Sequence, residues 1–395
     1  MCRKTRGWPS APPPPSQGTV RSSTCSISVG VGMAPSGMIS PHWSGTSGDD
    51  SDPGMIAMRT VYSTAPLRAL LLLAVTVLAA CASALSPAAP PPMISPSQTT
   101  PNQTGENFVM ADGTRLPYRA WLPDREESPW AVILALHGMN DSQDAWDYPA
   151  PAFTDAGIAL FAPDQRRFGH TAQRGHWPGV QALADDAAAM AGLLRARYPR
   201  AKLYLMGESM GAAALLVAAT GATPPKTDGY ILLAPAVWGR AHMNIFMRSS
   251  LWLVANLFPG LTATGQGAGR IPSDNREALE KLSRNPRTIK ETRFDAIRGM
   301  VDLMDAAHAA AAGFRAPALI LYGGKDQIIP QNATRAVWST LGDTARRAFY
   351  PNGYHLLLRD HGRATPIADI IAWARSPTVS FPAEEAAARF LTPPD

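Results

Sequence analysis

Short apolar runs that alternate with helical stretches constrain the fold of this chain more than any other feature of its sequence. Residues 131–136 form a continuous apolar run, which is typical of a strand covered on both faces. Similar runs occupy residues 158–162, 202–206, 230–233 and 318–322, a weaker one occupies 348–350, and a hairpin pattern occupies 108–110 and 116–121. Apolar residues at helical spacing fill the intervals, namely 180–198, 212–220 and 367–374. This order predicts an α/β fold with a mostly parallel central sheet flanked by helices.

One long interval breaks the alternation and divides the predicted core into residues 107–235 and 316–376. The interval, 236–315, contains an apolar and aromatic patch at 245–258, followed by polar and mixed helical stretches. We interpret it as a helical cap inserted over the carboxyl edge of the sheet. Residues 377–395, which follow the core, are predicted to be a C-terminal tail.

The N-terminal segment differs from the rest of the chain in composition. Residues 1–57 are a Pro/Ser/Gly mixture without apolar periodicity, which predicts either a disordered leader or a start codon assigned too early. Residues 58–80 have a short basic start and then an apolar run, as in a secretory signal; a short membrane anchor or a buried helix is the alternative. Residues 81–106, rich in Ser, Pro, Thr and Gln, are expected to be a tether.

The apolar run ends in Leu78-Ala79-Ala80-Cys81, which resembles the lipobox of bacterial lipoproteins. The resemblance implies that the thiol of Cys81 receives a diacylglycerol and that Cys81 becomes the mature N-terminus. Ala82 follows it, where an aspartate would favour retention in the inner membrane. We therefore expect a lipid-anchored protein of the bacterial cell envelope, on the periplasmic face of the outer membrane.

Charge and cysteine usage exclude several classes of protein. Lys and Arg number 36 against 31 Asp and Glu, and no dense basic stripe is present that would neutralise a run of phosphates. We therefore expect no nucleic-acid partner. The three cysteines, Cys2, Cys25 and Cys81, all precede the predicted core, which excludes a disulfide framework, a thiolate metal site and a cysteine protease there.

A nucleophile motif lies between a predicted strand and a predicted helix. Gly207-Glu208-Ser209-Met210-Gly211 directly follows the apolar run 202–206 and directly precedes an Ala-rich stretch. The bare pattern is weak, but in this context it predicts a sharp turn that exposes a serine hydroxyl at a helix N-terminus. Glycines are needed there because larger side chains would collide with the neighbouring strand and helix. We therefore predict that Ser209 is the nucleophile.

A serine nucleophile needs a general base and a carboxylate that orients the base. Asp326 lies just after the strand predicted at 318–322, and His355 lies on a loop after the next strand. Both are therefore expected at the same edge of the sheet as Ser209. The competing acids and bases are placed in the predicted cap or beyond the loop: Asp302, Asp305, His308 and His361.

Two backbone N–H groups are predicted to form an oxyanion hole. One belongs to Met210, the residue after the nucleophile, and the other to Met139, in the loop that follows the strand at 131–136. A plain strand-end turn is the alternative reading of this loop. His137, at the start of the loop, is expected to be a structural hydrogen-bonding residue and not a catalytic base.

Together these residues resemble the α/β-hydrolase superfamily, and within it the monoacylglycerol lipase and lysophospholipase-like branch, which is often grouped with serine aminopeptidases. The resemblance covers about residues 106–375 and rests on His137-Gly138, Ser142, residues 164–170, residues 207–211 and the surroundings of Asp326 and His355. It implies that Ser209 attacks an ester carbonyl, His355 takes and returns the proton, and Asp326 holds the imidazolium, without a metal or organic cofactor. The chain departs from the branch at Arg167, which replaces a glycine, and at Thr171, which stands next to the usual serine position.

The predicted function is hydrolysis of a carboxylic ester through an acyl-enzyme, with a lysophospholipid or monoacylglycerol as the small-molecule substrate. The apolar patch at 245–258 fits a lid over an acyl-chain pocket, and it fits equally a cap helix that packs on the core. A lipid anchor would hold the enzyme at a membrane that contains such esters. The alternatives are an acyltransferase, a hydrolase of small esters or peptides on the same triad, and a non-catalytic envelope lipoprotein.

Overall fold

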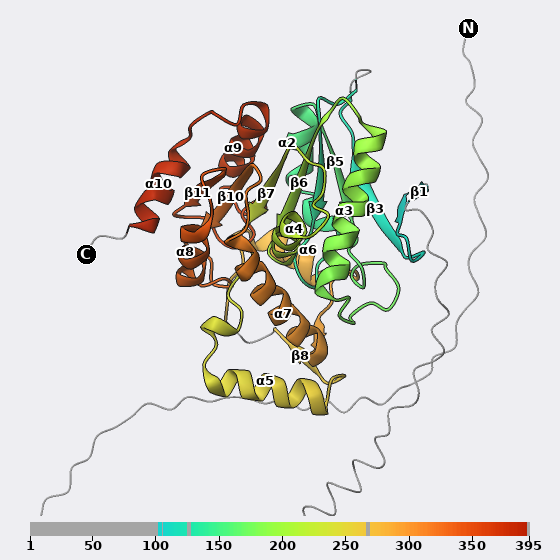
Figure 1. Ribbon diagram of the computed structural model, residues 1–395, viewed down its shortest axis with the longest axis vertical. Helices are drawn as coiled ribbons and strands as arrows, with labels where there is room; N and C mark the ends of the chain where they lie inside the picture. Colours follow the sequence, from blue (N-terminus) through green and yellow to red (C-terminus); the bar gives the residue numbers. More distant parts are fainter. Residues whose placement is uncertain (1–101, 105, 125–127, 266–268, 393–395) are drawn as a thin grey trace, which may run out of the picture. The chain divides into compact units, whose positions relative to one another are not determined.

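The central sheet of this protein is mixed, with a parallel core and an antiparallel edge. A computed structural model describes residues 102–104, 106–124, 128–265 and 269–392; the predicted leader, signal segment and Cys81 lie outside the described residues. Nine of the described strands form one sheet, in the order β1-β2-β3-β5-β4-β6-β7-β10-β11 (Figure 1). They are β1 (Asn102–Thr104), β2 (Asn107–Val109), β3 (Arg115–Trp121), β4 (Ala131–Leu136), β5 (Ile158–Pro163), β6 (Lys202–Glu208), β7 (Gly229–Leu233), β10 (Ala318–Gly323) and β11 (Ala345–Tyr350).

The direction of the strands follows from how they are connected. Strands β5, β4, β6, β7, β10 and β11 are parallel to one another, because the connections between them are crossovers that contain helices. Strands β1 to β3 form an antiparallel meander, and β3 is antiparallel to β5. The mostly parallel α/β sheet predicted from the sequence is confirmed.

Helices cover both faces of the sheet, as the continuous apolar strands require (Figure 1). Every residue of β4, β5 and β10 is buried. On one face the core includes side chains of α3 (Val180–Arg197), α4 (Met210–Thr220), α7 (Phe294–Ala311) and α8 (Gln331–Thr340). On the other face it includes α2 (Ala150–Asp155) and α9 (Ala364–Arg375).

The predicted cap is smaller than the sequence suggested. Between β7 and β10 the chain forms α5 (Ile245–Leu257), β8 (Thr262–Thr264), α6 (Arg276–Arg284) and β9 (Glu291–Arg293), and then α7. The C-terminal half of α7 packs on α4, and its Leu303, Ala307 and Ala311 are buried in the main core. The boundary at 315 was therefore wrong, since α7 is a core helix whose apolar side continues the helical layer.

Helix α5 differs from the other helices in what it exposes. It lies at the lower edge of the view in Figure 1, away from the sheet, and it buries Ala255 alone among its described residues. Ile245 and Phe246 are more than three quarters exposed, and Trp252 is about two thirds exposed. No helix in the described part of the chain has both the length and the apolar character that crossing a bilayer requires.

Two terminal segments depart from the sequence-based expectation. Residues 377–395, predicted as a tail, contain α10 (Pro382–Leu391), whose Phe390 stacks on Phe349 of β11 with ring centroids 4.5 Å apart. Arg346 of β11 also pairs with Glu384 of this helix. The end of the predicted tether, 81–106, contains β1, which pairs with β2. Both segments bind to the edges of the sheet, where strands would otherwise be left without a partner.

Candidate active site

The turn between β6 and α4 places Ser209 at the carboxyl edge of the sheet. Its backbone has φ +53° and ψ −109°, a conformation that non-glycine residues rarely adopt. Two hydrogen bonds hold it there: the Ser209 N–H donates to the Leu233 carbonyl (2.9 Å), and the Ala236 N–H donates to the Ser209 carbonyl (3.2 Å). Strained backbone of this kind persists where its surroundings fix it, and it is frequent at active sites.

The glycines on either side of Ser209 are required by close backbone approach. A Cβ at Gly211 would lie 2.3 Å from the Leu136 carbonyl oxygen, and one at Gly207 would lie 2.5 Å from the Ala212 nitrogen. Neither neighbour is a flexible side chain that could move aside. Strand β4, the turn and the start of α4 therefore meet in a space that only glycine fits.

We expect Gly211→Ala to lower the free energy of unfolding by about 2–3 kcal/mol, because the added methyl group overlaps main-chain atoms of β4. Gly192→Ala is the matched control: Gly192 is an exposed residue of α3 with no atom near its missing Cβ. The control should raise stability by up to about 1 kcal/mol, since alanine favours helices. Urea denaturation of both variants measures the difference, and equal stabilities would contradict the close approach.

Asp326 and His355 form a buried hydrogen-bonded pair. Asp326 follows β10, His355 follows β11, and the imidazole Nδ1 lies 2.8 Å from Asp326 Oδ2. The other carboxylate oxygen of Asp326 accepts from the N–H groups of Ile328 (2.7 Å) and Ile329 (2.9 Å), which fixes the orientation of the carboxylate. In this arrangement Nδ1 donates to Asp326, and Nε2 is left as the basic nitrogen.

The charge around His355 favours its protonated form. Burial lowers the pKa of His355, but the Asp326 carboxylate more than offsets this, so that the pKa lies above its ordinary value of 6.5. Glu208 also raises this pKa, and Arg359 lowers it. A base with a raised pKa accepts a proton from a serine hydroxyl more readily.

Ser209 and His355 line the same cavity, which has a volume of about 270 Å³. No hydrogen bond joins the Ser209 hydroxyl to the imidazole within the described residues, as is common in catalytic sites without substrate. The cavity is also lined by Met139 of the loop after β4, by Leu282 and by Thr288. The sequence-predicted nucleophile, base and oxyanion loop are thus brought to one cavity, and Asp326 lies behind the base.

The loop after β4 is held by His137. Its Nε2 accepts from the Gln165 N–H (3.1 Å), and its Nδ1 lies 2.8 Å from the Gly138 carbonyl, to which it donates. The Gln165 amide in turn donates to the His137 carbonyl (2.6 Å). Both imidazole nitrogens are engaged, so His137 has the structural role expected of it.

Within the described residues the N–H groups of Met139 and Met210 donate no hydrogen bond to protein atoms.

The competing acids and bases lie away from this cavity. Asp302 and Asp305 of α7 pair with Arg240, at 2.6 and 2.5 Å. His308 contacts the Val237 carbonyl through Nδ1 (3.2 Å).

Among the described residues, no three His, Cys, Asp or Glu side chains are grouped as a metal ion would require.

A second group of residues near Ser209 was not found from the sequence. Arg359 Nη2 lies 2.5 Å from Glu208 Oε1 and 2.8 Å from Asp141 Oδ2, and all three side chains are buried. Burial raises the pKa of Glu208, and the Arg359 guanidinium opposes this shift. The sequence signal was Glu208 at the second position of the G-x-S-x-G motif, because a carboxylate buried at that turn needs a cationic partner.

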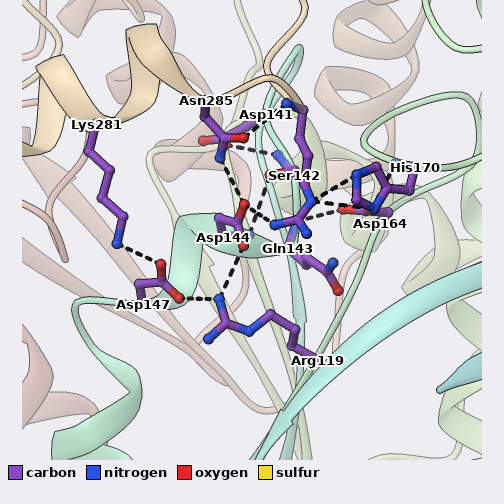
Figure 2. Close-up of polar contacts among 11 residues, drawn as sticks. Arg119, Asp141, Ser142, Gln143, Asp144, Asp147, Asp164, His170, Lys281 and Asn285 are labelled. Carbon is purple, nitrogen blue, oxygen red and sulfur yellow. Dashed lines mark hydrogen bonds and ion pairs between the residues drawn. The ribbon is translucent and has the colours of Figure 1, made fainter. Parts of the chain in front are cut away.

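The 3₁₀ turn η1 (Gln143–Trp146) connects the loop after β4 to the cap (Figure 2). Its Asp144 accepts hydrogen bonds from Arg287 (2.5 Å), Asn285 (2.8 Å) and Arg119 (3.1 Å). Burial raises the pKa of Asp144, but these hydrogen bonds, that of Arg287 first, lower it below its ordinary value. The segment after α6 is thereby held over the cavity by ionic contacts.

A neighbouring carboxylate, Asp164, fixes the loop that departs from the family pattern. It accepts from the N–H groups of Gln143 and His170, both at 2.8 Å (Figure 2). In the same loop Arg167 has φ +68°, the left-handed conformation that glycine favours. Arg167, which stands where the family resemblance leads one to expect a glycine, thus has a backbone conformation that suits glycine.

Comparison with known proteins identifies the family. The family described as "Serine aminopeptidase, S33" matches residues 127–362, more than half of the chain. A monoacylglycerol lipase of Mycolicibacterium smegmatis is 24% identical over 281 residues, which cover 68% of this chain and 95% of that protein. A monoglyceride lipase of Mus musculus is 27% identical over 265 residues, covering 64% of this chain and 84% of that protein.

Solved structures show the same fold. A soluble variant of monoglyceride lipase from Saccharomyces cerevisiae matches with a TM-score of 0.59 and 20% identity, covering 74% of this chain and all of that one. Monoacylglycerol lipase from Paleococcus ferrophilus matches with a TM-score of 0.57 and 20% identity, covering 66% and 98% of the two chains. The predicted α/β-hydrolase fold is thereby confirmed. The chain belongs to the serine aminopeptidase S33 family and is a hydrolytic enzyme of the α/β-hydrolase fold.

Proposed function

We propose that this enzyme hydrolyses carboxylic esters of fatty acids, with monoacylglycerols or lysophospholipids as substrates, through Ser209, His355 and Asp326. The observation that carries the proposal is the buried Asp326–His355 pair, whose imidazole shares one cavity with Ser209. The similarity to monoacylglycerol lipases supports ester hydrolysis.

The proposed reaction proceeds in two steps through an acyl-enzyme. Ser209 Oγ attacks the ester carbonyl carbon while His355 Nε2 takes the hydroxyl proton, and the carbonyl oxygen becomes an oxyanion that accepts from the Met139 and Met210 N–H groups. The intermediate collapses, the C–O bond to the alcohol breaks, and His355 protonates the departing alcohol. Water then attacks the acyl-enzyme with His355 as base, which releases the fatty acid and restores Ser209.

The surface of α5 supports a lipid substrate. Ile245, Phe246 and Trp252 are exposed on this helix, which follows β7 and so lies on the side of the sheet where Ser209 stands. Exposed apolar helices of this kind bind to lipid surfaces, where the apolar face enters the boundary of the bilayer. A diacylglycerol on Cys81 would keep the enzyme at the periplasmic face of the outer membrane, and we include this anchor in the proposal.

The proposal predicts a preference for long acyl chains. The full-length chain should hydrolyse monoacylglycerols with eight or more acyl carbons, or the matching lysophospholipids, at least about tenfold faster in kcat/KM than the acetyl ester, because each buried methylene contributes about 0.8 kcal/mol. Release of fatty acid from a series of monoacylglycerols, lysophospholipids and p-nitrophenyl esters measures this preference. An optimum at acetate, or cleavage of aminoacyl peptides in place of esters, would overturn the lipid assignment.

A further inference from the structure

One guanidinium joins the three loops that form the candidate site. Arg359 Nη2 contacts Glu208 at 2.5 Å and Asp141 at 2.8 Å, and the three side chains are each at most 7% exposed. Glu208 directly precedes Ser209 in the nucleophile turn, and Asp141 follows Met139 in the oxyanion loop. Arg359 belongs to the turn that begins at His355, closed by the hydrogen bond from its N–H to the Leu356 carbonyl (2.8 Å).

The Glu208 carboxylate lies beside the oxyanion loop at Gly138. A Cβ at Gly138 would lie 3.7 Å from Glu208 Oε1 and 3.6 Å from the Ser209 Cβ. The nucleophile turn therefore borders the oxyanion loop at Gly138, next to the Glu208 carboxylate. Arg359 holds that carboxylate from the histidine loop.

Stability alone does not account for this group of charges. A buried ion pair contributes little net stability, because removing the charges from water costs about as much as their attraction returns. The network also carries one positive and two negative groups, so that it favours positive charge nearby when both carboxylates are ionised. His355 becomes an imidazolium during the proposed reaction, and it is the adjacent group whose positive charge the network would stabilise.

We propose that Arg359 is a positioning residue: through Glu208 and Asp141 it fixes the nucleophile turn, the oxyanion loop and the histidine loop relative to one another. This inference rests on the function proposed above. It extends that function to a residue that touches neither Ser209 nor the His355–Asp326 pair within the described hydrogen bonds and ion pairs. A displacement of about 1 Å between such loops is enough to cost roughly 10²-fold in rate.

The test compares Glu208→Gln, Arg359→Lys and Arg359→Met in the full-length chain. Glu208→Gln keeps the size of the side chain and an oxygen that Arg359 can reach, so it should fold even if Arg359→Met does not. Arg166→Lys is the matched control, because Arg166 bridges Asp112 (2.5 Å) and Asp186 (2.7 Å), and none of the three lines the cavity of Ser209. The readouts are the rate of Ser209 labelling by a fluorophosphonate, kcat and KM for a p-nitrophenyl ester, and the pH profile of kcat/KM.

We expect Glu208→Gln and Arg359→Lys to lower the labelling rate and kcat roughly 10- to 100-fold with KM changed less than about twofold. The charged groups that face His355 are Asp326, Glu208 and Arg359. Loss of Glu208 charge should therefore move the acid limb of the profile to lower pH, and loss of Arg359 charge should move it to higher pH. These opposite shifts would not follow from a structural role.

Two results would overturn the inference. One is wild-type labelling and kcat in both Glu208→Gln and Arg359→Lys. The other is an equal loss of labelling in Arg166→Lys, which would show a general effect of weakened ion pairs. A wild-type chain that is labelled at Ser209 but cleaves no fatty acyl ester would instead overturn the proposed substrate, and the labelling rates would still decide the role of Arg359.

Discussion

Ser209→Ala is expected to lower kcat for ester hydrolysis by roughly 10⁴- to 10⁶-fold, because the proposed acyl-enzyme forms on the Ser209 hydroxyl. Folding should be retained. The Ser209 hydroxyl makes no hydrogen bond to protein within the described residues, and the backbone bonds to Leu233 and from Ala236 do not depend on the side chain. The change in the free energy of unfolding should therefore stay within about 1 kcal/mol.

The measurement pairs activity with covalent labelling. Fluorophosphonate should label the wild-type chain and Ser339→Ala, but not Ser209→Ala. Ser339 is an exposed serine of α8 whose hydroxyl donates to the Ala336 carbonyl, and it controls for labelling of surface hydroxyls. Circular dichroism and thermal denaturation confirm that the variants are folded. If folded Ser209→Ala still hydrolysed the ester, Ser209 would not be the nucleophile and the proposed serine mechanism would be wrong.

The fold could be predicted from the sequence where local pattern and tertiary structure agree. Strands β4 and β5 are continuous apolar runs because helices cover both of their faces, so the pattern alone located them. The nucleophile turn was located for the same reason, since its glycines are required by close contacts within a few residues and with one neighbouring strand. The pairing of Asp326 with His355 followed from the rule that parallel strands end at the same edge.

The elements that were missed depend on contacts distant in the sequence. Helix α10 is short and only partly apolar, and it is stabilised by Phe349 and Arg346 of β11, which no local pattern reveals. Helix α7 was assigned to the cap because its sequence neighbours are cap residues, although its packing partner is α4. Tertiary packing overrides local assignment in both cases.

The buried network around Arg359 was missed for a related reason. Glu208 and Arg359 are 151 positions apart, and neither belongs to a motif that demands the other. The sequence does show a charged residue in a stretch that must be buried, since Glu208 is the last residue of the central strand β6. A buried charge requires a partner, so this position could have prompted a search for one. Identification of the partner required the fold.

The pairing of Asp326 with His355 leads to the second large effect: Asp326→Asn should lower kcat by roughly 10⁴-fold without loss of folding. The reason lies in the two oxygens of Asp326. One accepts from the Ile328 and Ile329 N–H groups, so the amide oxygen of an asparagine will take that place and its NH₂ group will face His355. Nδ1 must then accept a hydrogen bond, the imidazole proton moves to Nε2, and the nitrogen facing the cavity can no longer take a proton from Ser209.

Asp302→Asn distinguishes this loss from the loss of any carboxylate near the cap. Asp302 of α7 was one of the two competing acids, and it pairs with Arg240. Its amide variant should keep kcat within about twofold of the wild type. Steady-state hydrolysis of a p-nitrophenyl ester compares the two variants, with fluorophosphonate labelling as a second readout. Because only Asp326 dictates which imidazole nitrogen carries the proton, a large loss in Asp302→Asn with little loss in Asp326→Asn would assign the orienting acid to α7 and place the base elsewhere than His355.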